Sequence, residues 1–209
     1  MKPYLELDKY ILFSDLHYWH NNILEYEPIR KRKKYQKILT NFLNIIPNKT
    51  HKQILNLWDF FFNLTDDKYQ QNKETIDKWR NEFKNMILVL WNHDTNKPVK
   101  FNKLNFDNNW NILNKEDSNA IVLKLFNCKA FYIDEDNEII KIFTHYPLWF
   151  LKANWQTYWF FYNIETFLFD YIKIKNKRVI NYHWHTHWKE FITDNNIEYI
   201  NVCFDYLIN

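Results

Sequence analysis

The sequence predicts an α/β domain in which short buried strands alternate with helices. Apolar residues make up 46% of the 209 residues and charged residues 25%, which is normal for a folded protein. Five short apolar runs each end in a segment that contains Asp, Asn or His. Continuous apolar runs of this kind are typical of parallel strands that are buried on both faces. We expect one domain that spans residues 1–209.

The expected elements follow from the apolar runs and from the residues that interrupt them. Strands are expected at 10–13, 53–57, 86–90, 121–126, 129–133, 139–143, 178–182 and 198–204, and helices at 35–46, 67–84 and 165–174. Pro47 is expected to end the first helix, and the second helix is expected to be polar and exposed. An Asn-rich connection covers about 95–119, and residues 146–162 are expected to be irregular.

Composition limits the class of protein. No apolar run is long enough for a membrane-spanning helix, and the first residues do not form the pattern of a signal peptide. Cys128 and Cys203 are too few for a disulfide framework, so we expect a reduced, cytoplasmic setting. The formal net charge of +3 is too small to indicate a nucleic-acid partner by itself.

The chain contains no glycine and ten tryptophans. Average usage predicts about 15 glycines in a chain of this length. Two explanations are open: the protein truly lacks glycine, or a codon that means glycine has been read as tryptophan. Some bacteria read UGA as glycine, whereas common alternative translation tables read it as tryptophan. Much Asn and Lys with little Ala and Arg is the bias expected of an AT-rich genome.

Polar motifs stand where the apolar runs end. In chain order they are Asp15-Leu16-His17, Trp58-Asp59, Trp91-Asn92-His93-Asp94, His145 and Trp184-His185-Thr186-His187. The carboxyl ends of parallel strands form the edge at which open α/β sheets bind ligands. Imidazole together with carboxylate suits Mn, Fe, Zn or Co. No cysteine lies near these motifs, which argues against a structural thiolate zinc site.

This order of motifs resembles the calcineurin-like metallophosphoesterase family, whose motifs are D-x-H, G-D, G-N-H-D/E, H and G-H-x-H. Every polar residue of the pattern is present in order between about residues 10 and 204. Residues 14–20 also resemble the S-D-x-H-x-G-H opening of a small bacterial branch, and His20 there is a candidate to contact phosphate or to support a metal ligand. The resemblance implies a metallophosphoesterase-like αββα sandwich, with two mixed β-sheets flanked by helices.

The motif glycines of the family are tryptophans here. Trp58, Trp91 and Trp184 occupy the three positions, and Trp19 and Trp188 lie where glycine would be natural. Such loops bring backbone close to metal and phosphate, which favours a residue with no side chain. We therefore interpret most of the tryptophans as glycines encoded by recoded UGA. Among those outside the motifs, Trp79, Trp110 and Trp159 stay unassigned.

The resemblance also implies a dinuclear metal centre and a hydrolase activity. Two divalent ions are implied, Mn, Fe, Zn or Co with Mn favoured: Asp15, His17 and His187 would hold the first, Asn92, His145 and His185 the second, and Asp59 would bridge them. The implied reaction is hydrolysis of a phosphomonoester or phosphodiester by a metal-bridging hydroxide. His93 is the candidate general acid, with Asp94 as its orienting partner. Neutral Asn92 would leave the centre with a net positive charge that attracts phosphate.

Plainer explanations and one alternative function stay open. Taken singly, Asp59 could cap a helix, His145 could be a buried packing residue, and His183 matches no motif position. The alternative is a non-catalytic protein that binds a nucleotide or nucleic acid through the basic run 30–34 and the aromatic run 158–162, with a degenerate metal site. The complete ligand set argues against it. We expect a small phosphoester substrate and no membrane partner, with nucleic acid not indicated.

Overall fold

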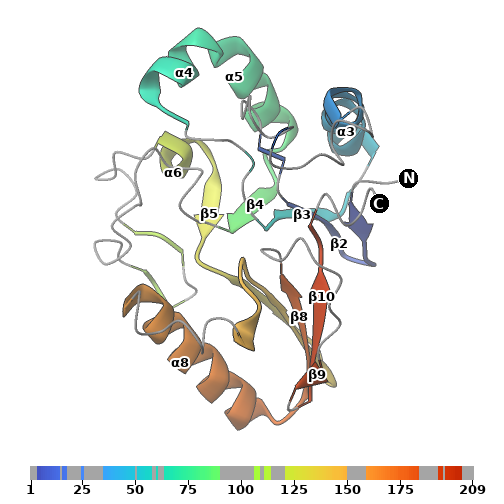
Figure 1. Cartoon of the computed structure of the whole chain (residues 1–209), viewed down its shortest axis with the longest axis vertical. Coiled ribbons are helices and arrows are strands. Elements are labelled where there is room, and N and C mark those ends of the chain that lie inside the picture. The colour runs from blue at the N-terminus through green and yellow to red at the C-terminus, as the bar shows by residue number, and fades with distance from the viewer. Residues whose placement is uncertain are drawn as a thin grey trace.

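The structure is a computed structural model with two mixed β-sheets and helices packed on their outer faces (Figure 1). It describes residues 4–14, 16–17, 25, 35–49, 51–57, 60, 64–89, 106–108, 111–113, 121–149, 159–183, 193–194 and 196–203. Within these ranges, no helix combines the length and the apolar character needed to cross a membrane. The thiols of Cys128 and Cys203 are both buried.

The first sheet contains, in spatial order, β1 (Leu5–Glu6), β2 (Tyr10–Phe13), β3 (Gln53–Asn56), β4 (Met86–Val89) and β5 (Asn127–Lys129). β1 is antiparallel to β2, and the other neighbours are parallel. Phe13 pairs with Asn56, and Asn56 pairs with Leu88. The carboxyl ends of β2, β3 and β4 are therefore level with one another.

The second sheet has the order β6 (Tyr132–Glu135), β7 (Ile139–Phe143), β8 (Arg178–His183), β10 (Ile197–Asn201) and β9 (Thr193–Asp194). β7, β8 and β10 are parallel, and the two outer strands are antiparallel to their neighbours. Phe143 pairs with Tyr182, and His183 pairs with Asn201. The carboxyl ends of β7, β8 and β10 are level in the same way.

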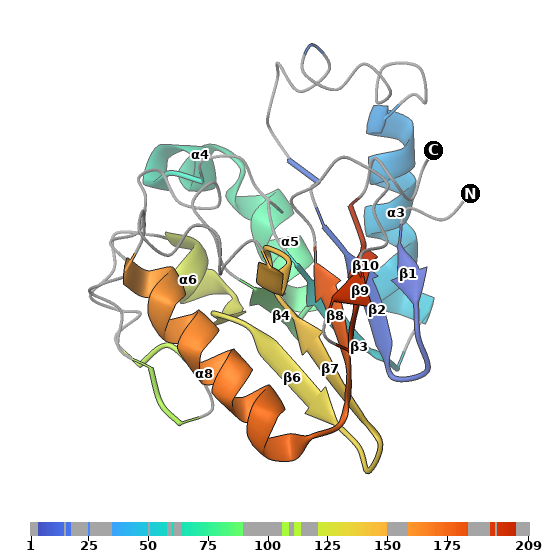
Figure 2. The same ribbon diagram turned by 60° about the horizontal axis from the view of Figure 1, so that its bottom comes forward.

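Alternating side chains on the strands fill separate apolar layers. On β2, Tyr10 and Leu12 face the second sheet, where they belong to one cluster with Phe143 and Tyr182. Ile11 and Phe13 face the other way, in a cluster with residues of α3 (Tyr35–Lys49), α5 (Lys73–Glu82) and α6 (Ile121–Leu125). The outer face of the second sheet packs against α8 (Trp159–Lys175), which lies across it in Figure 2. The layers therefore run helices, sheet, sheet, helix.

Several expected elements are confirmed, and others are wrong. The strands at 10–13 and 139–143 match β2 and β7, and the strands at 53–57, 86–90, 178–182 and 198–204 are found with shifted ends. Residues 121–125 form α6 rather than a strand, and Val122, Leu123 and the following Phe126 are buried at the spacing of one helical face. The strand expected at 129–133 is divided, because β5 ends at Lys129 and β6 begins at Tyr132.

The helices also differ from the expected ones. The polar helix at 67–84 is two helices, α4 (Asp66–Gln71) and α5, separated at Asn72, whose side-chain amide donates to the Lys68 carbonyl at 2.9 Å. It is not wholly exposed, because Ile76 and Trp79 are buried. α3 continues past Pro47 to residue 49, so the proline lies in the last turn of the helix and does not end it. α8 begins at residue 159, inside the segment expected to be irregular.

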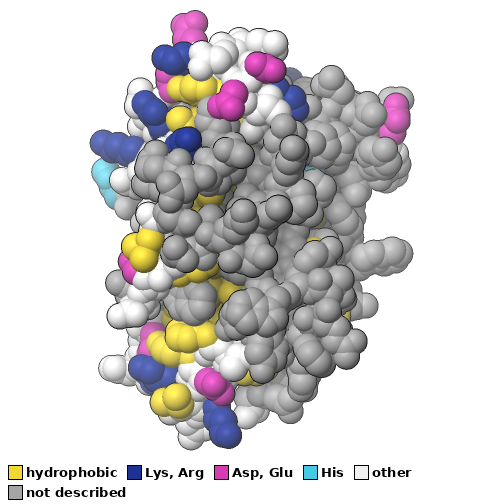
Figure 3. Space-filling view, turned by 90° about the vertical axis from the view of Figure 1, so that its left-hand side faces the viewer, with side chains coloured by type: hydrophobic (Ala, Val, Ile, Leu, Met, Phe, Trp, Pro, Cys, Tyr) yellow, Lys and Arg dark blue, Asp and Glu magenta, His cyan; other side chains and the backbone are white. Residues whose placement is uncertain are grey.

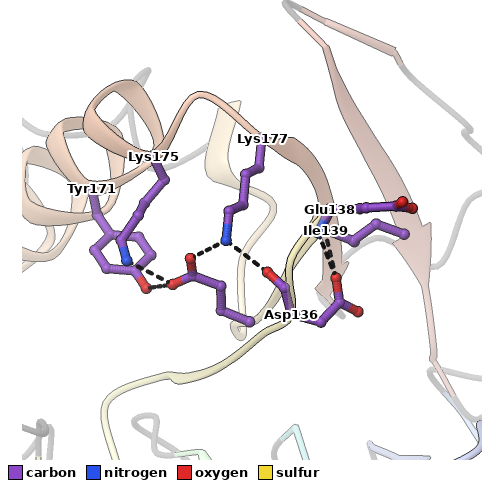
Figure 4. A network of polar contacts seen from close by, with 7 residues as sticks. Asp136, Glu138, Ile139, Tyr171, Lys175 and Lys177 are labelled. Carbon is purple, nitrogen blue, oxygen red and sulfur yellow. Dashed lines mark hydrogen bonds and ion pairs between the residues drawn. The ribbon is translucent and has the colours of Figure 1, made fainter.

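A cluster of charged side chains fixes the end of α8 to the hairpin between β6 and β7 (Figure 4). Glu135 accepts hydrogen bonds from Tyr171 and from Lys177 Nζ at 2.5 Å, and Lys175 Nζ lies 3.0 Å away. The Lys177, Tyr171 and Lys175 donors lower the pKa of Glu135 to about 2. Burial and the Glu135 carboxylate raise the pKa of Tyr171 to about 12. The network positions α8 over the second sheet.

Candidate metal centre

Buried polar side chains gather at one kind of position in the described part of the chain. Apart from tyrosine and cysteine, each lies within four residues of the carboxyl end of β2, β3, β7, β8 or β10. They are Ser14, His17, Asn56, Thr144, His145, Asn181, His183 and Asn201. Burying a polar group costs about 1–3 kcal/mol unless hydrogen bonds replace those it made with water. Buried polar side chains concentrated at strand ends are typical of the sheet edge at which α/β proteins bind ligands, and not of an apolar core.

Hydrogen bonds join these strand ends across both sheets. Within the first sheet, the Leu57 amide donates to the Phe13 carbonyl at 2.9 Å. The Ser14 hydroxyl donates to the Val202 carbonyl at 2.9 Å and so connects the end of β2 to the end of β10. The Val202 amide donates in turn to the His183 carbonyl at 2.9 Å.

The series is completed at β7, where the Thr144 amide donates to the Tyr182 carbonyl at 3.0 Å. The carboxyl ends of β3, β2, β10, β8 and β7 are therefore linked in that order. The two sheets present these ends on the same side of the molecule, because the link between Ser14 and Val202 is direct. Any group held by the strand-end residues would be reached from both sheets.

His17 has an unusual backbone at this edge. Its φ is 46°, in the left-handed region, and its residue is only 8% exposed. A left-handed conformation costs a residue other than glycine about 1–3 kcal/mol, and such residues cluster at ligand sites. The other positive-φ residues in the described ranges are Asn176, which follows α8, and Asn196, between β9 and β10. Those two lie in turns, where asparagine commonly replaces glycine.

His145 lies in a turn directly after β7 and is buried, at 4% exposure. Its ring meets the ring of Tyr146 edge to face, with the centroids 4.4 Å apart. The hydroxyl of Thr144 donates to the Tyr146 carbonyl at 2.7 Å, so the residues on both sides of His145 are bonded to each other. The histidine is therefore carried by a tightly closed turn.

Of the seven ligands that the motifs predict, the structure describes His17 and His145. The other five, Asp15, Asp59, Asn92, His185 and His187, lie outside the described residues, as do His93, Asp94 and His20. Among the described residues no group of three or more His, Cys, Asp or Glu side chains is placed to hold a metal. What the structure does bring together are the strand ends that immediately precede most of the motifs.

Three described residues, Ser14, Leu57 and His183, come shortly before predicted ligands that lie outside the described residues, and all three are buried. Asp15 follows Ser14, Asp59 is two residues beyond Leu57, and His185 is two residues beyond His183. Carboxylate and imidazole side chains supply oxygen and nitrogen donors, which suit divalent ions such as Mn²⁺. The residue types that follow these ends in the sequence therefore fit the implied metal ions.

Sequence reasoning did not single out Asn181 as a site residue, although it lies fully buried in the middle of an apolar strand. A polar residue inside the run Val179–Tyr182 was the available signal. His183, which matched no motif, is 2% exposed and its ring lies 6.1 Å from that of Tyr199.

In comparisons with protein families, curated proteins and solved structures, nothing matches this chain.

Proposed function

We propose that this chain is a metal-dependent phosphoesterase of the calcineurin-like type, built on the αββα sandwich of that family. The observation that carries the proposal is the shared edge. The strand ends that precede the D-x-H, G-D, H and G-H-x-H motifs are linked by hydrogen bonds, and the buried polar side chains of the described part gather there. Four of the five motifs follow these ends in the sequence, and the remaining motif, residues 91–94, follows β4 of the first sheet.

In this proposal the residues divide into ligands and a proton donor. Asp15, His17 and His187 would hold one ion, Asn92, His145 and His185 would hold the other, and Asp59 would be shared between them. Divalent ions bound there would supply positive charge for a phosphoryl group and a water of lowered pKa. His93 gives its proton to the departing alkoxide oxygen, and a positioned proton donor contributes typically about 10²–10⁴-fold to rate. Asp94 orients the imidazole.

The proposal includes glycine at the motif tryptophans. Leu57 is fully buried just before Trp58, and His183 is 2% exposed just before Trp184. An indole buries about 150–250 Å² and needs a matching pocket. In this proposal, side chains of that size in the motif loops would compete with a phosphate for space. Glycine at these positions leaves that space open and also permits positive φ.

The deciding experiment measures hydrolysis by a glycine-restored chain, which carries Trp58→Gly, Trp91→Gly and Trp184→Gly. Phosphomonoester and phosphodiester substrates with a chromogenic leaving group are supplied with Mn²⁺. We expect turnover that is abolished by Asp59→Asn, because an amide does not bridge two cations as a carboxylate does. His51→Asn, an exposed histidine away from the strand ends, is the matched control and keeps full turnover.

Absence of turnover together with salt-sensitive binding of single-stranded nucleic acid would overturn the proposal in favour of the non-catalytic alternative. The basic run 30–34 and the side chains of the aromatic run 158–162, on which that alternative depends, lie outside the described residues. On α5, Lys73 lies 3.2 Å from Asp77 and Lys78 lies 3.8 Å from Glu82, so basic side chains are paired with acidic ones. Figure 3 shows basic and acidic side chains interspersed over the described part of one face.

A further inference from the structure

Asn181 spans the turn that carries His145. Its side-chain nitrogen donates to the Ile142 carbonyl at 3.1 Å and to the Thr144 hydroxyl oxygen at 2.8 Å, before the turn. Its side-chain oxygen accepts from the Leu148 amide at 3.0 Å, after the turn. One side chain on β8 therefore holds both ends of a segment that follows β7.

A second hydrogen bond extends this hold into the turn itself. The Thr144 hydroxyl accepts from Asn181 and donates to the Tyr146 carbonyl at 2.7 Å. His145 is the residue between these two bonded positions. With the residues on each side fixed and the ring 4% exposed, the backbone of His145 has little freedom to shift.

An asparagine buried at this position costs free energy of folding unless its hydrogen bonds supply something that an apolar side chain lacks. Asn181 is fully buried in β8, between Ile180 and Tyr182, which face the apolar layer between the sheets. A buried amide loses its hydrogen bonds to water, and apolar groups of the same shape are often equally stable or better. The contacts of Asn181 are concentrated on residues 142–148, so what it adds is the geometry of that turn.

We propose that Asn181, acting through Thr144, is a positioning residue that sets the His145 imidazole for the second metal ion. This inference rests on the proposed function. Residues that orient a metal ligand commonly contribute about 10–100-fold to metal affinity. Among the described residues, the hydrogen bonds of the Asn181 side chain reach residues 142–148 and the adjacent Tyr182 carbonyl. Its loss is therefore expected to weaken the ion on the His145 side and to spare the ion assigned to Asp15, His17 and His187.

The test measures Mn²⁺ binding to the glycine-restored chain by equilibrium dialysis with elemental analysis, and by the electron paramagnetic resonance spectrum of bound Mn²⁺. The parent chain binds two ions with a spin-coupled spectrum. Asn181→Leu, which keeps the branched shape and the number of heavy atoms but makes no hydrogen bonds, binds one ion tightly and the second about 10–100-fold more weakly, with an uncoupled spectrum. Val179→Ala, on the same face of β8, is the control: it removes buried packing but keeps two coupled ions.

A second pair of variants covers the case in which Asn181→Leu does not fold, as judged by circular dichroism. Thr144→Val keeps the shape of the side chain and removes the hydroxyl that joins Asn181 to Tyr146, so it also weakens one ion. Thr144→Ser restores the hydroxyl and recovers the second ion. Two tight, coupled ions in Asn181→Leu or Thr144→Val would refute the positioning role alone, whereas no Mn²⁺ on the parent chain would refute the proposed function as well.

Discussion

The hydroxyl of Ser14 donates to the carbonyl of Val202 across 188 residues of sequence, at 2.9 Å, and is fully buried. Ser14 directly follows β2 of the first sheet, and Val202 directly follows β10 of the second, so this bond connects the carboxyl ends of the two strands. Asp15, the first predicted ligand, is the next residue after Ser14. The same contact thus joins the two sheets and fixes the chain at the point where the candidate centre begins.

Replacing Ser14 by alanine is expected to affect both stability and metal binding. Ser14→Ala leaves a buried carbonyl without its donor, which costs about 1–3 kcal/mol of unfolding free energy in urea. Mn²⁺ affinity is expected to fall as well, because Asp15 loses its anchor. The control is Thr65→Ala, which removes the hydroxyl that caps α4 and costs about 1 kcal/mol far from the strand ends. Equal loss of Mn²⁺ from both variants would contradict the inference that Ser14 anchors the ligand Asp15.

Trp79 is expected to be a true tryptophan, unlike the motif tryptophans. Ile76, Trp79 and Phe83 share one buried face at helical spacing, and the Trp79 ring meets Phe60 edge to face with centroids 5.9 Å apart. Trp79→Gly would leave a large cavity, about 3–5 kcal/mol, and add about 1 kcal/mol for glycine inside a helix. Urea unfolding measures this loss, and restoring glycine at Trp58 should cause no such loss.

The same contrast predicts the coding sequence and the mass of the natural protein. Codon 79 is expected to be UGG, and codons 58, 91 and 184 are expected to be UGA. Peptide mass spectrometry of the protein from its own cells should find tryptophan at 79 and glycine at the other three positions. Glycine at 79, or tryptophan throughout, would contradict this division.

Much of the strand framework could be predicted because its signal is local. An apolar run followed by a polar motif marks where a buried strand ends, and β2, β7 and β8 end where that pattern predicts or within one residue of it. The prediction of a strand at 121–126 was wrong because a short apolar segment has the same pattern in a buried strand and in a helix such as α6. Whether such a segment becomes a helix or a strand depends on the residues it packs against, and these lie elsewhere in the sequence.

The candidate site was predicted unevenly for a similar reason. His17 and His145 stand out as histidines after apolar strands, and both are buried at the strand ends. The positive φ of His17 and the role of Asn181 depend on tertiary structure. Asn181 acts on Ile142, 39 residues earlier in the chain, and only the parallel register of β7 and β8 brings them together.

Stability should depend on pH through Glu135. Its ordinary pKa is 4.5 and its folded pKa is about 2, held down by Lys177, Tyr171 and Lys175. A lowered folded pKa means that the stabilisation is complete above about pH 4.5 and is lost as pH falls from there towards 2. Glu135→Gln should therefore lower Tm at pH 7, with the difference from the parent shrinking as the pH is lowered below 4.5.

Glu138→Gln is the matched control, because Glu138 is an exposed carboxylate on the same hairpin. It should leave Tm close to that of the parent at every pH. A Glu135→Gln deficit that stays constant down to pH 3 would show that the side chain stabilises by packing and not by its charge.

His93 should separate proton donation from metal binding. His93→Asn is expected to lower kcat by about 10²–10⁴-fold on substrates with a poor leaving group, because the departing alkoxide then receives no positioned proton. On a substrate whose leaving group is already a weak base the loss should be much smaller, since little proton transfer is needed. Mn²⁺ content should stay at the parent value, as measured by elemental analysis, because His93 is not a ligand in this scheme. A variant that loses metal in proportion to rate, or loses rate equally on both substrates, would assign His93 to the metal centre or to packing.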